Sequence, residues 1–120
     1  MVKNKKILLS SPSIFGNEWK YVKDCLDTEW ISTAGKYINK FEEKIKVITG
    51  AKYAIACINA TSALQISVLL SGAKNGDEII VPTTTFIAPI NAVIYNNCSP
   101  IFMDTDEFHN IDEEKTIQFI

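Results

Sequence analysis

The sequence predicts an α/β fold, in which a parallel or mixed sheet carries helices on both faces. Three short apolar runs, at 53–58, 78–82 and 100–104, are rich in β-forming residues and have the length of buried strands. Between them, the apolar residues of 62–72 and 86–97 recur with helical spacing. Strands that alternate with helices form βαβ units, because two parallel strands need a crossover connection.

Two amphipathic helices are expected before the first of these strands. The first follows Asn17, and its apolar residues lie three or four positions apart: Trp19, Val22, Leu26 and Trp30. The second has one apolar stripe and ends at Gly50. That stripe consists of Tyr37, Phe41, Ile45 and Ile48. We therefore divide the chain into a helical segment, residues 1–50, and an α/β segment, residues 51–120.

Local signals support the elements of the second segment. Cys57 lies inside the first apolar run, so we expect a small buried side chain there. The run at 78–82 is entered through a turn at 75–77, and Pro89 is tolerable only in the first turn of its helix. Asp112 is placed to cap a further helix that reaches the last apolar residues.

Composition excludes several classes of function. The formal net charge is −2, no stretch is strongly basic, and all twelve basic residues are lysines. Nucleic acid is therefore not an expected partner, because phosphate backbones are bound by cationic faces. The apolar run at residues 7–9 is too short for the core of a signal peptide, and no run approaches the length of a membrane span. We expect a cytoplasmic protein without membrane contact.

No metal or redox centre is expected. Cys25, Cys57 and Cys98 are odd in number and widely spaced, and His109 is the only histidine. None of these spacings matches a metal-binding motif.

Three junctions could carry chemistry, because ligands of parallel α/β sheets bind beyond the carboxyl ends of the strands. The first, at 59–62, has four short side chains that would let an anion approach the free N–H groups of a helix N-terminus. The alternative is a plain helix cap made by Asn59 or Thr61. The residues alone favour the cap.

The other two junctions also have a structural alternative, which the residues alone favour. Phe86 follows three threonines at a strand end, where its ring could stack on a planar cofactor or pack into the core. Asp104 and Asp106 could form an acidic pair for a metal or phosphoryl group, or they could cap a turn. A glycine-rich dinucleotide motif and a Walker phosphate loop are both absent.

Four stretches in close order carry a family resemblance. They are "GNEWKYVKDCLDTEWISTAGKYINKFEEKI", "GAKYAIACINATSALQISVLL", "GDEIIVPTTTFIAPINAVIY" and "PIFMDTDEFHNID". From Pro12 onward the chain resembles the start of the pyridoxal-phosphate-dependent nucleotide-sugar aminotransferases, the DegT/DnrJ/EryC1/StrS family. It is most similar to the branch that aminates C4 of UDP-linked 4-keto-6-deoxy-N-acetylhexosamines. The resemblance implies the N-terminal part of the large domain of a fold-type-I, aspartate-aminotransferase-like enzyme.

The resemblance also implies roles for five residues. Thr61 and the backbone N–H of Ser62 would hold the phosphate of pyridoxal 5′-phosphate, and Phe86 would stack on its pyridine ring. Ser32 and Thr33, in the loop of the helical segment, would lie near the nucleotide-sugar. In this family the active site forms between two subunits, which implies a homodimer. Many relatives have glycine at the position of Ala60 and histidine at that of Gln65.

The implied reaction is a ping-pong transamination, in which an amino-acid donor, expected to be glutamate, supplies the amino group for the sugar ketone. The family's Schiff-base lysine and the carboxylate that pairs with the pyridinium nitrogen lie beyond residue 120. We therefore expect a fragment of a longer enzyme, with no catalytic residue of its own and no activity alone. The alternative is a non-catalytic α/β module that binds a partner or a phosphorylated small molecule.

Overall fold

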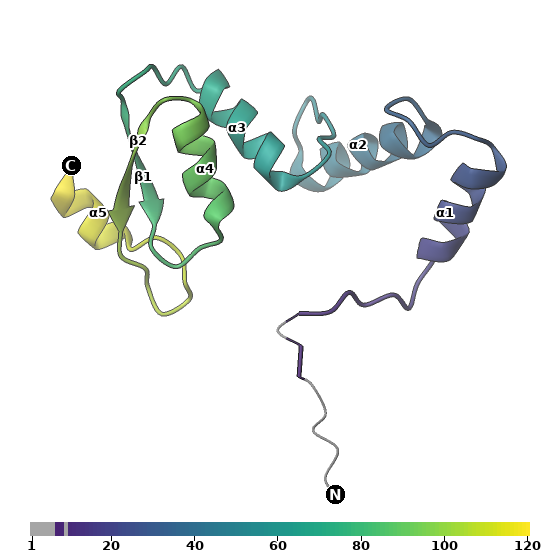
Figure 1. Cartoon of the computed structure of the whole chain (residues 1–120), viewed down its shortest axis with the longest axis horizontal. Coiled ribbons are helices and arrows are strands. Elements are labelled where there is room, and N and C mark those ends of the chain that lie inside the picture. The colour runs from purple at the N-terminus through teal and green to yellow at the C-terminus, as the bar shows by residue number, and fades with distance from the viewer. Residues whose placement is uncertain (1–6, 9) are drawn as a thin grey trace, which may run out of the picture. The chain divides into compact units, whose positions relative to one another are not determined.

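The computed structural model describes residues 7, 8 and 10–120, and it divides into two compact units (Figure 1). The N-terminal unit extends to Ile55, and the C-terminal unit runs from Ala56 to Ile120. Each unit is described below by itself.

The N-terminal unit contains two helices, α1 (Glu18–Asp27) and α2 (Lys36–Thr49). The predicted stop of the second helix is confirmed, because Gly50 adopts a left-handed conformation with φ of 71° and its N–H donates to the carbonyl of Lys46. That conformation is accessible to glycine at little cost. Neither helix contains a buried residue, so their apolar stripes are only partly covered.

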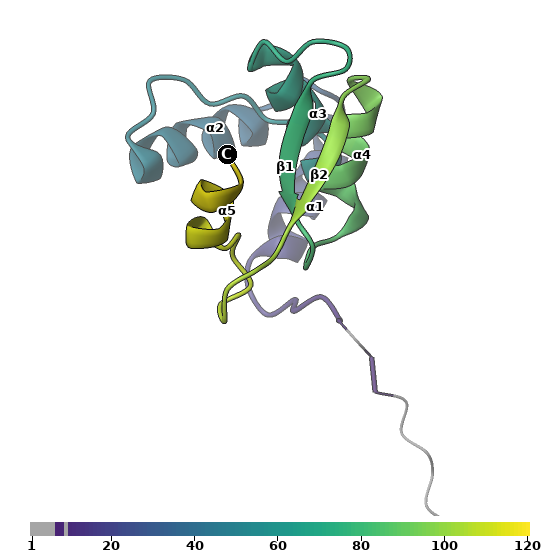
Figure 2. The same cartoon turned by 90° about the vertical axis from the view of Figure 1, so that its left-hand side faces the viewer.

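The C-terminal unit is an α/β unit with five elements: α3 (Ala60–Leu70), β1 (Glu78–Pro82), α4 (Ile87–Tyr95), β2 (Ser99–Met103) and α5 (Glu113–Phe119). The two strands pair in parallel, in a register that runs from Glu78 opposite Ser99 to Pro82 opposite Met103. Each strand therefore has one unpaired edge, and such edges tolerate a proline. Both views place α4 and α5 on opposite sides of the two strands (Figures 1 and 2).

The core lies between α4 and the sheet. Val81 of β1, Val93 of α4 and Cys98 pack together, with the partly buried Ile79 and Ile90 around them. The amide of Asn96 then ties α4 to α3, since it donates to the carbonyl of Gln65 at 3.0 Å and to that of Ala92 at 2.8 Å. The two helices are therefore joined at the C-terminal end of α4.

One predicted strand does not form, because the run at 53–58 has no strand assignment in the structure. Tyr53, Ile55 and Ile58 are 74%, 84% and 91% exposed. A buried parallel strand needs hydrogen-bonded neighbours, and this run pairs with neither β1 nor β2. The expectation that Cys57 is buried is wrong for the same reason, since its thiol is exposed.

No helix in the described part of the chain has both the length and the apolar character needed to cross a membrane.

Candidate functional site

The first turn of α3 is capped by Asn59. Its side-chain oxygen accepts a hydrogen bond from the N–H of Ser62 at 2.9 Å, so the plain-cap interpretation describes this contact correctly. The N–H groups of Ala60 and Thr61 and the Thr61 hydroxyl have no hydrogen-bond partner among the described residues. Three donors therefore stay available at the positive end of a helix, which is where anions bind.

Phe86 occupies the N-cap position of α4 in extended conformation, and its side chain is 87% exposed. The interpretation as a core residue of the helix is therefore wrong, and the ring is free to stack on a planar group. Pro89 is the third residue of α4, where its missing N–H costs nothing, as predicted.

The third junction contains a turn instead of an open acidic pair. A carboxylate oxygen of Asp106 accepts from the N–H groups of Phe108 at 2.9 Å and Asn110 at 2.8 Å, which caps the turn that follows. Asp104 instead pairs with Lys115 at 2.5 Å. Within the described ranges, no group of three His, Cys, Asp or Glu side chains is placed to hold a metal ion.

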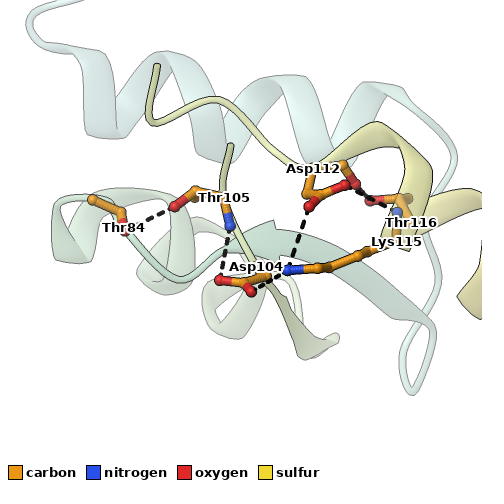
Figure 3. A network of polar contacts seen from close by, with 6 residues as sticks. All are labelled: Thr84, Asp104, Thr105, Asp112, Lys115 and Thr116. Atoms are coloured by element: carbon orange, nitrogen blue, oxygen red, sulfur yellow. Dashed lines mark hydrogen bonds and ion pairs between the residues drawn. The ribbon is translucent and has the colours of Figure 1, made fainter. Parts of the chain in front are cut away.

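A polar network joins the carboxyl ends of both strands to α5 (Figure 3). The hydroxyls of Thr84 and Thr105 lie 3.1 Å apart, and the N–H of Thr105 donates to the Asp104 carboxylate at 3.1 Å. Lys115 lies between two carboxylates, with its Nζ 2.5 Å from Asp104 and 3.4 Å from Asp112. Asp112 also caps α5 by accepting from the N–H of Lys115 at 3.0 Å, as the sequence predicted.

This network changes the titration of its charged groups. The hydrogen bond from Lys115 holds the pKa of Asp104 below its ordinary value of 3.8. The same bond raises the pKa of Lys115 above 10.5. The sequence alone did not indicate a charged network around Lys115. The spacing of three residues to Asp112 could have suggested one contact, but the contact with Asp104 depends on the path of the loop between them.

The N-terminal unit has a pocket of about 590 Å³, which is lined mainly by the loop between α1 and α2 and by the facing ends of both helices. Ser32 belongs to its lining, whereas Thr33 does not. Two of its lining residues, Lys36 and Asp24, form an ion pair at 2.5 Å. Hydrogen bonds from Lys36 and then Tyr37 lower the pKa of Asp24, and burial raises the pKa of Tyr37. The sequence placed Tyr37 only on an apolar helix stripe, and it gave no signal for a role of Asp24 or Lys36.

The five predicted site residues thus fall into two groups. Thr61, Ser62 and Phe86 belong to the C-terminal unit, at the N-termini of two helices that pack against each other. Ser32 and Thr33 belong to the N-terminal unit. The roles of all five stay predictions.

Comparison with known proteins gives a consistent result. Residues 12–120 match the sequence profile described as the DegT/DnrJ/EryC1/StrS aminotransferase family. The chain is 46% identical to the GDP-perosamine synthase of Escherichia coli O157:H7 over 102 residues, which are 85% of this chain and 28% of the synthase. It therefore spans less than a third of the length of that relative.

Solved structures agree with the fold. An aminotransferase from Psychrobacter cryohalolentis superposes with a TM-score of 0.79 and 33% identity, over 89% of this chain and 28% of its own. NtdA of Bacillus subtilis, solved with bound cofactor PMP, gives a TM-score of 0.71 and 32% identity, over 84% of this chain and 25% of its own. These likenesses confirm the predicted fold class.

Proposed function

We propose, from the premise that this chain belongs to the DegT/DnrJ/EryC1/StrS aminotransferase family, that it supplies the cofactor-holding part of a nucleotide-sugar aminotransferase. The cofactor is pyridoxal 5′-phosphate. The observation that carries this proposal is that two helices in contact both present binding groups at their N-termini: free donors at the start of α3 and the exposed ring of Phe86 at the start of α4. An anion and a flat ring are what these two helix ends can bind.

Each group has a distinct task. The Thr61 hydroxyl and the N–H groups of the first turn of α3 bind the cofactor phosphate, and Ser62 contributes its N–H once the Asn59 side chain turns away. Phe86 stacks on the pyridine ring and fixes its plane. When bound, the cofactor acts as an electron sink for the bonds at the reacting carbon. Ser32 lines the pocket of the N-terminal unit, and there, with Thr33 beside it, it contacts the nucleotide-sugar.

The finer substrate assignment is also a proposal. The sugar is a nucleotide-linked 4-keto-6-deoxy hexose, which is aminated at C4 with glutamate as donor. A UDP-linked N-acetylhexosamine follows from the family branch, whereas similarity to a GDP-perosamine synthase favours a GDP-linked sugar. The assembly is a homodimer in the cytoplasm.

Cofactor binding is the direct test. The 120-residue chain is titrated with pyridoxal 5′-phosphate, and binding is followed by the cofactor's absorbance and by NMR signals of Phe86. Thr61→Val removes a hydrogen bond to a charged group, and such a loss weakens affinity by about 10-fold or more. Thr49→Val is the matched control, because the Thr49 hydroxyl bonds only within the N-terminal unit, donating to the Ile45 carbonyl and accepting from the N–H of Ala51. Equal affinities for wild type, T61V and T49V would contradict the proposal. They would favour the alternative function, a non-catalytic α/β module.

A second measurement concerns the lysines. After treatment with pyridoxal 5′-phosphate and borohydride, we expect no stoichiometric reduced adduct on any of the twelve lysines. A Schiff base needs an unprotonated amine, and the carboxylate of Asp104 keeps Lys115 protonated by raising its pKa. A single fully modified lysine found by mass spectrometry would overturn this expectation.

The substrate is tested with a chimera. This chain replaces the matching segment of the E. coli GDP-perosamine synthase, and the chimera is given glutamate with either UDP-linked or GDP-linked 4-keto-6-deoxy sugars. We expect amination of at least one of them, and the preferred nucleotide distinguishes the two substrate assignments. A folded, cofactor-loaded chimera that aminates neither sugar contradicts the substrate class.

A further inference from the structure

We propose that Thr105 is a positioning residue for Phe86, which it holds in place through the hydroxyl of Thr84. This proposal rests on the proposed function, in which Phe86 stacks on the cofactor ring. Thr105 lies after β2 and Thr84 after β1, so the contact joins the carboxyl ends of two neighbouring parallel strands.

Phe86 depends on its backbone for its position. Its side chain is 87% exposed, so packing does not fix the ring. On its C-terminal side the chain enters α4, which is anchored in the core by Ile90 and Val93. On its N-terminal side lies the segment 83–85, whose three side chains are all exposed. The placement of the ring therefore depends on what holds this segment.

Two contacts hold that segment, and both come from the end of β2. The N–H of Thr83 donates to the carbonyl of Met103 at 2.8 Å, which continues the ladder by one step. The hydroxyls of Thr84 and Thr105 then meet at 3.1 Å. The hydroxyl pair is the last cross-strand contact before Phe86, so its loss frees the two residues between Thr84 and α4.

Thr105 is itself held in place from α5 (Figure 3). Thr105 pairs with Ile111 in an antiparallel bridge, and its N–H donates to the Asp104 carboxylate. The other oxygen of that carboxylate contacts Lys115 of α5, while the Asp104 carbonyl accepts from the N–H of Asp112 at 2.9 Å. Thr105 is thus fixed on both of its flanks before it reaches across to Thr84.

The experiment measures the mobility of residues 84–86 in the ¹⁵N-labelled 120-residue chain, without cofactor. In the wild type we expect backbone order parameters of about 0.85, as in rigid structure. Thr105→Val keeps the side-chain shape and removes the hydroxyl, and we expect the order parameters of Thr85 and Phe86 to fall towards ~0.6. Thr105→Ser keeps the hydroxyl and should restore the wild-type values.

Two comparisons separate positioning from general loosening. Thr84→Val alone and together with T105V should give the same effect as T105V, because both changes remove one contact. Thr49→Val removes a hydroxyl from α2 and should leave residues 84–86 unchanged. The order parameters of Val81 and Phe102, inside the strands, serve as the folding control. The proposal is overturned if residues 84–86 are unaffected by T105V, if T105S fails to rescue, or if the T84V and T105V effects add.

Addition of pyridoxal 5′-phosphate then separates this proposal from the proposed function. If the cofactor shifts the Phe86 ring signals, and if T105V lowers the affinity measured from that shift by about 2- to 10-fold, both proposals are supported. If mobility responds as expected but the cofactor leaves the Phe86 signals unchanged, the positioning role of Thr105 stands and the stacking role of Phe86 fails.

Discussion

The two units of the chain differ in how they bury apolar residues. Among the residues that the structure describes, those below one-tenth exposure all belong to the C-terminal unit: Val81, Ala92, Val93, Cys98 and Met103. The helices of the N-terminal unit carry clear apolar stripes, yet neither buries a residue. A sheet with a helix packed on it covers side chains from two directions, whereas two short helices leave most of each stripe in water. Amphipathic pattern alone therefore does not make a core.

The largest expected effect tests this contrast in packing. Val93→Ala removes two methyl groups from the centre of the C-terminal core and should lower the free energy of unfolding by about 2 kcal/mol. Val47→Ala is the same change on α2, where the side chain is 83% exposed, and its effect should stay within about 0.5 kcal/mol. Urea unfolding, monitored by amide signals from each unit, measures the change in the free energy of unfolding for both variants. A comparable loss from V47A would show that the face of α2 that carries Val47 is covered in solution.

A smaller effect concerns the helix ends. Asn59 caps α3 with its side chain, whereas Asn17 at the start of α1 makes no side-chain capping bond. Asn59→Ala should therefore destabilise the C-terminal unit by about 1 kcal/mol.

Asn17→Ala is the matched control and should change the stability of the N-terminal unit by no more than about 0.5 kcal/mol. Thermal unfolding followed by circular dichroism and NMR gives both values. If the two substitutions cost the same, the difference in capping between the helices is not real in solution.

The smallest effect is shared by both units, because in each a lysine pairs with an aspartate and lowers its pKa. Lys115 lowers the pKa of Asp104, and Lys36 lowers that of Asp24. A lowered pKa contributes stability above the unfolded value of 3.8, and this contribution is lost as the pH falls through the folded value. Acid should therefore weaken both pairs only below about pH 4.

Carboxyl chemical shifts measured against pH test these pairs separately. Lys115→Met should raise the titration midpoint of Asp104 and leave that of Asp24 unchanged. Lys36→Met should raise the midpoint of Asp24 and leave that of Asp104 unchanged. A midpoint that does not respond to the loss of its own lysine would show that the ion pair is not populated in solution.

Much of the fold could be predicted from local signals. The strand at 78–82 was placed correctly, Gly50 ends its helix as expected, and Asp112 caps α5. α3 begins two residues earlier than predicted, because Asn59 already serves as its cap. The family resemblance is confirmed by the match over residues 12–120. These features depend on residues close to one another in the sequence, so their signals are local.

What could not be predicted depends on distant partners. The run at 53–58 has every property of a buried strand, but a strand exists only where a neighbour offers hydrogen bonds. The pairing of Lys115 with Asp104 and the contact between Thr84 and Thr105 likewise join residues from different elements. The family resemblance predicted that Phe86 stacks on the cofactor, but no sequence signal indicated that Thr84 and Thr105 hold it in place.

The parallel register of β1 and β2 also has a consequence for the order in which the chain folds. Every residue of β1 meets a partner that lies 21 positions later, as with Thr84 and Thr105 at the ends of the strands. The helices of the N-terminal unit need only local contacts and form within about a microsecond. The sheet must first close a loop that contains all of α4, and such non-local pairing is slow. During synthesis, β1 therefore leaves the ribosome with both edges open and stays unpaired until residue 103 has followed.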